Sequence, residues 1–192
     1  MSTKRGRPRN MDTQNAILAA SYDLLLEQGF GSVTVEKIAE RAGVSKATIY
    51  KWWPNKAAVV MDGFLSASTA RIPVPDTGSV SEDLVIHVTR LVRFMTSREG
   101  NVIKELVGEG QMDAGLAETY RSRYFRPRRL EASQILERGI RRGELKDRLD
   151  LELCLDQIYG PIFYRLLILS DELDENYVEH LVKWVLEGLA AK

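Results

Sequence analysis

Cysteine and histidine are scarce in this sequence. Among 192 residues there is one cysteine, Cys154, so no disulfide can form within the chain, and the two histidines, His87 and His180, lie far apart. Neither is part of the paired Cys or His spacings that hold structural zinc. We therefore expect a cytoplasmic protein with no metal ion and no cofactor, in which Cys154 is a small buried side chain.

Long apolar runs are also missing. One of the longest, residues 158–169, is interrupted by Arg165, so no segment is suited to span a membrane. The basic residues near the N-terminus lead into the polar residues 10–15 and not into the apolar region of a signal peptide. We expect no membrane partner.

The chain as a whole has no net charge, because 27 basic residues balance 27 acidic ones. Taken alone, this balance gives no indication of a nucleic-acid partner. However, residues 1–56 contain nine basic and five acidic side chains, whereas the remainder contains 18 and 22. Such an asymmetry indicates two functions in one chain.

Apolar residues recur at helical spacing through most of the chain, and no segment shows the convincing alternation of a half-buried strand. We predict an all-α fold of about nine helices. Residues 159–169 are apolar on all sides and are compatible with a buried strand, but their continuity with the apolar residues before them favours a helix. The predicted helices cover residues 12–28, 35–41, 46–53, 56–66, 79–98, 101–112, 116–142, with a kink at Pro127, 150–170 and 174–191.

Two of these helices are short and carry clear start and stop signals. Thr34 is placed to cap the helix over 35–41, and Gly43 to end it in the left-handed conformation. Ser45 is placed to cap the next helix, with Val44 and Ile49 as a hydrophobic staple. Two short helices joined in this way form a helix-turn-helix.

The second short helix has two distinct faces. Ile49 and Trp53 fall together on one side and are suited to burial, while residues 46, 47, 50 and 51 fall on the other. An outward face of this kind enters the major groove of DNA. We predict base contacts from Lys46, Ala47 and Tyr50, and phosphate contacts from Ser45, Thr48, Lys51 and Lys56.

The run from Thr34 to Lys56 resembles the DNA-binding segment of the tetracycline-repressor (TetR) family, and the resemblance extends over about residues 12–60. It implies a homodimer with an N-terminal three-helix DNA-binding domain and a C-terminal domain that dimerises and binds a small inducer. Trp52 and Trp53 depart from the family pattern, which has a smaller polar or histidine-like residue and Phe there. The resemblance implies backbone contacts from Thr34, Ser45, Tyr50, Trp52 and Lys56, and contacts near bases from Lys46, Ala47 and Thr48.

The first eleven residues contain four basic side chains and no acidic one. The segment Lys4–Arg9 resembles the core of an AT-hook, in which Arg5 and Arg7 would enter a narrow minor groove. The alternative is a solubilising tail. We expect a flexible basic arm over 1–11, a DNA-binding domain over 12–56 and a ligand-binding and dimerisation domain over 57–192.

Two sets of residues are candidates for the remaining functions. Apolar stripes on the last two helices are suited to a four-helix dimer interface, although either stripe is also compatible with a core position. The interface candidates are Leu151, Leu155, Ile158, Ile162, Val178, Leu181, Val182, Val185, Leu186 and Leu189. The ligand candidates, aromatic, apolar or polar residues on predicted inward faces, are Phe64, His87, Leu91, Phe94, Met95, Tyr120, Tyr124, Gln157, Tyr159 and Phe163.

The sequence therefore predicts a DNA-binding transcriptional regulator, a repressor released from its operator by a small molecule. The alternative is a DNA-binding regulator without an inducer. A small helical enzyme is disfavoured because the chain has no P-loop, no Gly-rich dinucleotide turn, no nucleophile elbow and no metal-ligand spacing.

Overall fold

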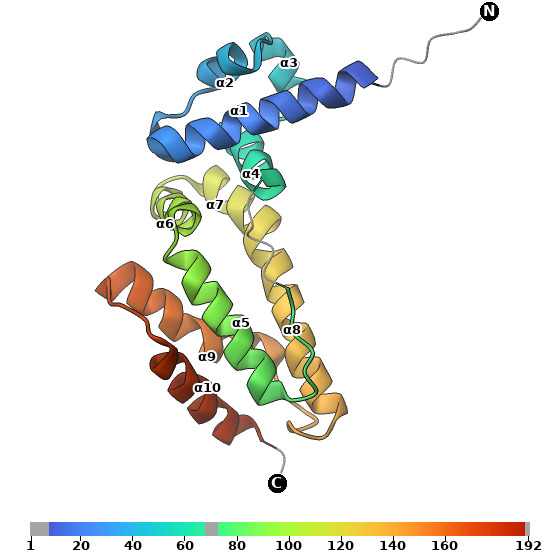
Figure 1. The fold of residues 1–192 in the computed structure, drawn as a ribbon, viewed down its shortest axis with the longest axis vertical. Coiled ribbons are helices and arrows are strands. Elements are labelled where there is room, and N and C mark those ends of the chain that lie inside the picture. Colours follow the sequence, from blue (N-terminus) through green and yellow to red (C-terminus); the bar gives the residue numbers. More distant parts are fainter. Residues whose placement is uncertain (1–7, 68–72, 191–192) are drawn as a thin grey trace, which may run out of the picture. The chain divides into compact units, whose positions relative to one another are not determined.

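The computed structural model describes residues 8–67 and 73–190, and its regular elements within these ranges are helical (Figure 1). One isolated antiparallel bridge joins Leu145 to Ala190. The all-α prediction is confirmed. The α-helices are α1 (Pro8–Ser32), α2 (Val35–Ala42), α3 (Lys46–Tyr50), α4 (Lys56–Ala67), α5 (Val80–Met95), α6 (Arg98–Gly110), α7 (Ala114–Tyr120), α8 (Arg126–Arg141), α9 (Leu151–Tyr164) and α10 (Glu175–Leu189), and the π-helices are η1 (Arg121–Phe125) and η2 (Arg165–Leu169).

The described residues form two compact units. The first comprises 8–67 and 101–124, and the second comprises 73–100 and 125–190. The first unit therefore holds α4, most of α6 and α7 in addition to the helices of the segment 12–56. No helix within the described ranges is both long enough and apolar enough to cross a membrane.

The first unit is built around α1, which packs against α2 and α4, while α3 packs on α2 and α7 on α4. Its core includes Ile17, Ile38 and Phe64, which have no exposed surface. The buried Ser21 hydroxyl donates to the Leu18 carbonyl at 2.9 Å and faces Gly63 of α4. The absence of a side chain at position 63 lets α1 and α4 approach closely.

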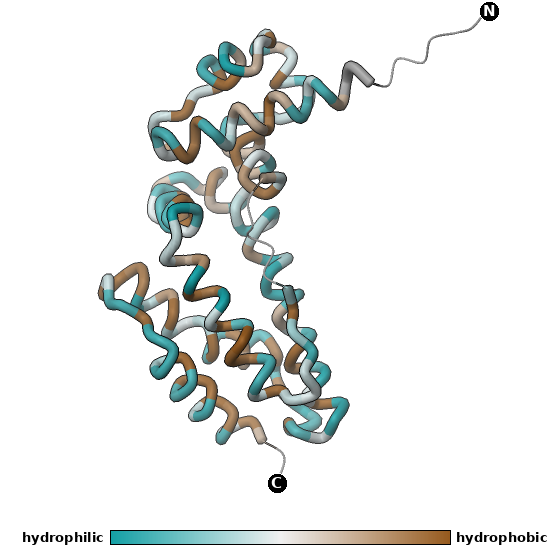
Figure 2. Tube along the Cα trace, viewed as in Figure 1, coloured by the Kyte–Doolittle hydropathy of each residue, from teal (hydrophilic) through white to brown (hydrophobic). Residues whose placement is uncertain are grey.

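In the second unit α5 packs against α8 and α10, and α9 contacts the same two helices. Each turn of α5 and α10 contains both hydrophobic and hydrophilic residues (Figure 2), as expected for helices with one buried face. Leu84 and Val88 of α5 and Val182 of α10 have no exposed surface. Cys154 is 3% exposed, as expected, and burial raises the pKa of its thiol.

The structure differs from the predicted helices at several places; among them, the helix predicted over 46–53 ends at Tyr50. The first helix begins at Pro8 instead of Asp12, with proline at the first helical position, where its missing N–H costs nothing. The long segment 116–142 is divided by η1, which ends at Phe125, two residues before Pro127, because proline cannot continue the hydrogen-bond ladder and its ring crowds the preceding turn. Residues 159–169 are helical, ending in η2, so the strand alternative is excluded.

Candidate nucleic-acid interface and ligand residues

The turn between α2 and α3 has the predicted local chemistry. The Thr34 hydroxyl accepts the Lys37 N–H at 3.2 Å, and the Ser45 hydroxyl accepts the Thr48 N–H at 3.2 Å. Gly43 ends α2 with φ 66° and ψ 35°, the left-handed conformation that favours glycine. The two short helices are therefore joined as a helix-turn-helix.

The faces of α3 are divided as the residue spacing predicted. Ile49 is 1% exposed and Trp53, just after the helix, is 4% exposed, whereas Tyr50 leaves 53% of its surface open. Lys46, Ala47 and Lys51 are exposed as well. The outward face therefore combines two cations, a phenol and a methyl group, which suit phosphates and base edges.

Lys46 is paired with an acidic residue of α2. Its Nζ lies 2.9 Å from Glu36 Oε1, and both side chains are more than half exposed. The hydrogen bond between them raises the pKa of Lys46 and lowers the pKa of Glu36. A base or phosphate that binds Lys46 therefore shares or competes for an ammonium group that already has an acidic partner.

The other predicted phosphate contacts differ in accessibility. Thr48 Oγ1 lies 2.9 Å from Ser45 Oγ, so the two hydroxyls already share a hydrogen bond on the exposed end of α3. Lys56 is turned toward Phe30, because its Nζ donates to the Phe30 carbonyl at 2.9 Å and lies 3.9 Å from the centre of the Phe30 ring. Burial lowers the pKa of Lys56, although Glu109, Glu105 and Asp113 oppose this shift. Arg5 and Arg7 lie outside the described residues.

Trp52 and Trp53 follow α3 and contact each other edge to face, with ring centres 5.8 Å apart. Trp52 is half-buried, and the Trp53 indole N–H donates to Asp62 Oδ2 of α4 at 2.8 Å. Asp62 in turn forms an ion pair with Arg123 of η1. Sequence reasoning missed Asp62, since a lone acidic residue in an apolar helix gives no signal beyond its isolation among Val59, Val60, Met61 and Phe64.

In the second unit two of the ligand candidates form a buried polar pair. Tyr159 Oη lies 2.8 Å from His87 Nδ1, and the two residues are 8% and 6% exposed. Burial, with the positive charges of Arg128 and Arg90, lowers the pKa of His87 to about 4, and burial raises the pKa of Tyr159. Both side chains are therefore neutral near pH 7 and can exchange a hydrogen bond with a neutral polar group.

The remaining ligand candidates do not form one group. Phe64 and Tyr124 are buried in the first unit with ring centres 6.3 Å apart, and Tyr120, in the same unit, is half-buried. The second unit holds Phe94 and Met95, which are buried, Leu91 and Phe163, which are half-buried, and Gln157. Gln157 is exposed, opposite the buried side of α9, and so does not have the inward position that we predicted for it.

Six interface candidates are buried within the chain's own core. Leu155, Ile158, Ile162 and Val182 have no exposed surface, and Val178 and Leu189 are 1% and 8% exposed. The other four candidates, Leu151, Leu181, Val185 and Leu186, are half-buried. The most continuous apolar stripes on α9 and α10 therefore fill the second unit.

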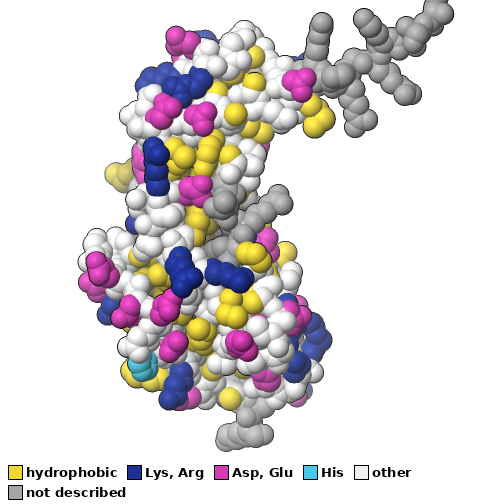
Figure 3. Space-filling model, in the orientation of Figure 1, with side chains coloured by type: hydrophobic (Ala, Val, Ile, Leu, Met, Phe, Trp, Pro, Cys, Tyr) yellow, Lys and Arg dark blue, Asp and Glu magenta, His cyan; other side chains and the backbone are white. Residues whose placement is uncertain are grey.

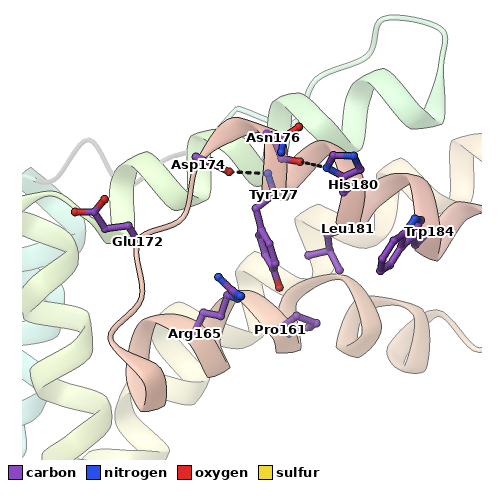
Figure 4. A pocket seen from close by; sticks show the side chains of 9 residues that line it. All are labelled: Pro161, Arg165, Glu172, Asp174, Asn176, Tyr177, His180, Leu181 and Trp184. Atoms are coloured by element: carbon purple, nitrogen blue, oxygen red, sulfur yellow. Dashed lines mark hydrogen bonds between the residues drawn. The ribbon is translucent and has the colours of Figure 1, made fainter.

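A second, less continuous apolar face remains exposed on the same helices. Trp184 is 70% exposed, Ile168 68% and Tyr164 54%. Trp184 and Leu181 border an open groove of about 670 Å³ between α9 and α10, and the Arg165 guanidinium lies 4.4 Å from the centre of the Tyr177 ring (Figure 4). On the face shown in Figure 3, basic and acidic side chains lie interspersed. The large aromatic residues at 164 and 184 were the sequence signal for this face.

Comparison with known proteins agrees with this architecture. Residues 17–61 match the family described as bacterial regulatory proteins, tetR family, and residues 74–185 match the tetracyclin repressor-like C-terminal domain. The chain is 63% identical to the uncharacterized HTH-type transcriptional regulator YdeS of Bacillus subtilis (strain 168), covering 100% of this chain and 96% of YdeS.

Two further proteins are similar along most of the chain. The DNA-binding transcriptional repressor TetR of Mycobacteroides abscessus is 28% identical, over 89% of this chain and 90% of that protein. The crystal structure of the TetR family transcription regulator SCO0332 superposes with a TM-score of 0.79 and 36% identity, covering 93% of this chain and 99% of that structure. These relatives are regulators and not enzymes.

The helix-turn-helix of the first unit, the helical second unit and these similarities lead to one conclusion. This chain is a DNA-binding transcriptional regulator that belongs to the TetR family.

Proposed function

We propose that this regulator is a cytoplasmic repressor that binds a near-palindromic operator as a homodimer and leaves it when a small molecule binds. The observation that carries the proposal is α3, capped by Ser45, with Ile49 and Trp53 buried and Ala47, Tyr50 and Lys51 exposed. This division presents a short helix to the major groove. The repressor from Mycobacteroides abscessus, which is similar along most of the chain, supports repression over activation.

For DNA recognition, we assign base contacts to Ala47, Tyr50 and Lys46. The contact from Lys46 competes with its ion pair to Glu36. Lys51, Ser45, Thr48 and Thr34 are assigned to phosphates, with Trp52 as an indole donor. Lys56 acts from within the first unit, by holding Phe30, and not at a phosphate. Arg5 and Arg7 are assigned to the minor groove beside the operator.

For dimerisation, we assign the exposed apolar face of α9, η2 and α10. Tyr164, Ile168 and Trp184 leave large apolar surfaces open, and the half-buried Leu181 lies beside Trp184 in the groove. A twofold contact between such faces would bury them in both copies. Two recognition helices spaced by one duplex turn, about 34 Å, then read the two half-sites.

For the inducer, we assign a site in the second unit that includes His87 and Tyr159. The rest of that unit's core is largely apolar, so a buried pair of neutral hydrogen-bonding side chains suits a mostly apolar ligand with a polar group. Binding that favours the DNA-free state would lower the operator affinity. A regulator without an inducer is the alternative.

A binding-site selection from a random duplex library tests the DNA-binding function directly. We expect enrichment of an inverted repeat, and fluorescence anisotropy should then give tighter binding to this operator than to a shuffled duplex of equal length. The variant Ala47→Glu should lose this preference, because a carboxylate on the outward face repels the groove, while Met112→Glu, at an exposed position in the same unit, should keep it. Enrichment of no sequence would contradict the proposal.

A small-molecule screen for release of the selected operator then separates a repressor that responds to an inducer from a DNA-binding regulator without one.

A further inference from the structure

Asp62 connects two segments of the first unit that are distant in sequence. Its Oδ2 accepts the indole N–H of Trp53 at 2.8 Å, and its Oδ1 forms the ion pair with the Arg123 guanidinium. Trp53 follows α3, while Arg123 belongs to the π-helix η1. Both oxygens of one carboxylate are thus used, and the three side chains form a continuous chain from η1 through α4 to the end of the helix-turn-helix.

Trp53 holds the end of α3 in place. Its backbone N–H donates to the Ile49 carbonyl at 3.0 Å, its ring meets that of Trp52 edge to face, and only 4% of its surface is exposed. A helix of five residues has little stability of its own, so its direction depends on the residues that anchor its ends. Because a buried indole N–H without an acceptor is costly, the orientation of Trp53 depends on Asp62.

Arg123 in turn orients Asp62. The carboxylate side chain is 32% exposed and the Arg123 side chain 37%, so this pair lies at the edge of the unit. The guanidinium holds one carboxylate oxygen by a charge-assisted hydrogen bond, which restrains the carboxylate and leaves its other oxygen to accept from the indole. Arg123 itself projects from a π-helix, an uncommon element that occurs frequently at functional sites.

We propose that Asp62 and Arg123 are positioning residues for DNA recognition, because through Trp53 they set the angle at which α3 meets the DNA. A change in the geometry of η1 then changes the affinity for the operator. The proposal rests on the proposed function, because it takes α3 to be the element that reads the operator. Neither residue needs to touch DNA. A change in η1 would alter binding without altering the outward face of α3.

The test uses the full chain with Arg123→Gln. The three tryptophans give three indole N–H signals in a ¹H–¹⁵N NMR spectrum, which Trp52→Phe and Trp184→Phe assign. In Arg123→Gln the Trp53 signal should shift while the Trp184 signal stays, and operator affinity should fall about tenfold, as expected for partners in one hydrogen-bond network. Arg123→Lys should recover part of the loss.

The matched control is Arg121→Gln, which removes an equal charge from the same π-helix. Arg121 pairs with Glu118 at 3.5 Å and takes no part in the chain to Trp53. This control should leave the Trp53 signal in place and cost only the small, sequence-independent affinity of one cation. Equal losses in the two variants, with no shift of the Trp53 signal, would overturn the proposal.

A second variant, Asp62→Asn, keeps an acceptor for the indole but loses the charge that holds Arg123. Its operator affinity should fall as far as that of Arg123→Gln, and the double variant should fall no further, whereas additive losses would show that the residues act separately and contradict the proposal. Wild-type protein that binds operator and shuffled duplex equally would instead refute the proposed function. In that case a shift of the Trp53 signal in Arg123→Gln would still show that Arg123, Asp62 and Trp53 are coupled.

Discussion

Gly63 of α4 lies directly against Ser21 of α1: a Cβ at position 63 would stand 2.0 Å from Ser21 Oγ and 2.8 Å from the Leu18 carbonyl oxygen. The second of these atoms belongs to the backbone, so a rotamer change cannot relieve the overlap. Gly63→Ala should force α1 and α4 apart and lower the free energy of unfolding by roughly 3 kcal/mol, which urea denaturation measures.

Gly108 is the control for this substitution. It lies in α6 of the same unit, and a Cβ there would meet no atom within 4 Å. Gly108→Ala should leave stability unchanged or raise it by up to about 1 kcal/mol, because alanine loses less backbone entropy in a helix. Similar effects of the two substitutions would show that α1 and α4 are not in close contact.

Lys51 is expected to contact a phosphate from the exposed face of α3. Removal of one such contact lowers affinity on every duplex and reduces the slope of log affinity against log salt by about 0.9. Lys51→Ala should therefore bind operator and shuffled DNA more weakly in equal proportion. Lys183→Ala, at an exposed lysine of α10, serves as the charge-matched control and should retain the wild-type slope in anisotropy titrations over several salt concentrations.

Trp184→Glu should dissociate the proposed dimer without unfolding the chain. The side chain is 70% exposed in one copy, so the charge costs nothing in an isolated subunit but cannot be buried between two. Sedimentation velocity should show monomers, and operator binding should be lost with them. Leu130→Glu, at a leucine of α8 that is 69% exposed, should remain dimeric. If Trp184→Glu remained dimeric, the dimer interface would have to lie on a different face.

His87 should make stability depend on pH. Its pKa in the folded chain is about 4, below the ordinary value of 6.5, so the unfolded chain binds a proton first as the pH falls. The free energy of unfolding should therefore be undiminished above pH 6.5 and should decrease by about 3 kcal/mol between pH 6.5 and 4. Urea denaturation at several pH values should show a smaller decrease for His87→Gln than for wild type. An identical pH dependence in both proteins would contradict a depressed pKa at His87.

The helix-turn-helix was the part of the fold most completely predictable from sequence. Its caps and turn depend on side chains that act on backbone atoms a few residues away, as Ser45 does on Thr48 and Gly43 on the end of α2. The outward and inward faces of α3 follow from helical spacing alone. Local chemistry of this kind can be read from a single sequence.

Which of two apolar faces lies inside was not predictable in the same way. Periodicity identified the stripe that contains Leu155, Ile158 and Val182, but a stripe has the same spacing whether it faces its own core or a second copy. The pairs that depend on long-range packing were equally hidden, since His87 and Tyr159 are 72 residues apart and Arg123 and Asp62 are 61 apart. Their meeting depends on helix packing, which local propensity does not encode.

The burial of Leu155, Ile158 and Val182 within one chain has a consequence for how the regulator responds in the cell. A subunit that completes its core before meeting a partner can fold first and associate later, as two separate equilibria. If the operator is bound by the proposed dimer, the assembled fraction depends on the amount of protein made, so operator occupancy depends on expression level as well as on any small molecule.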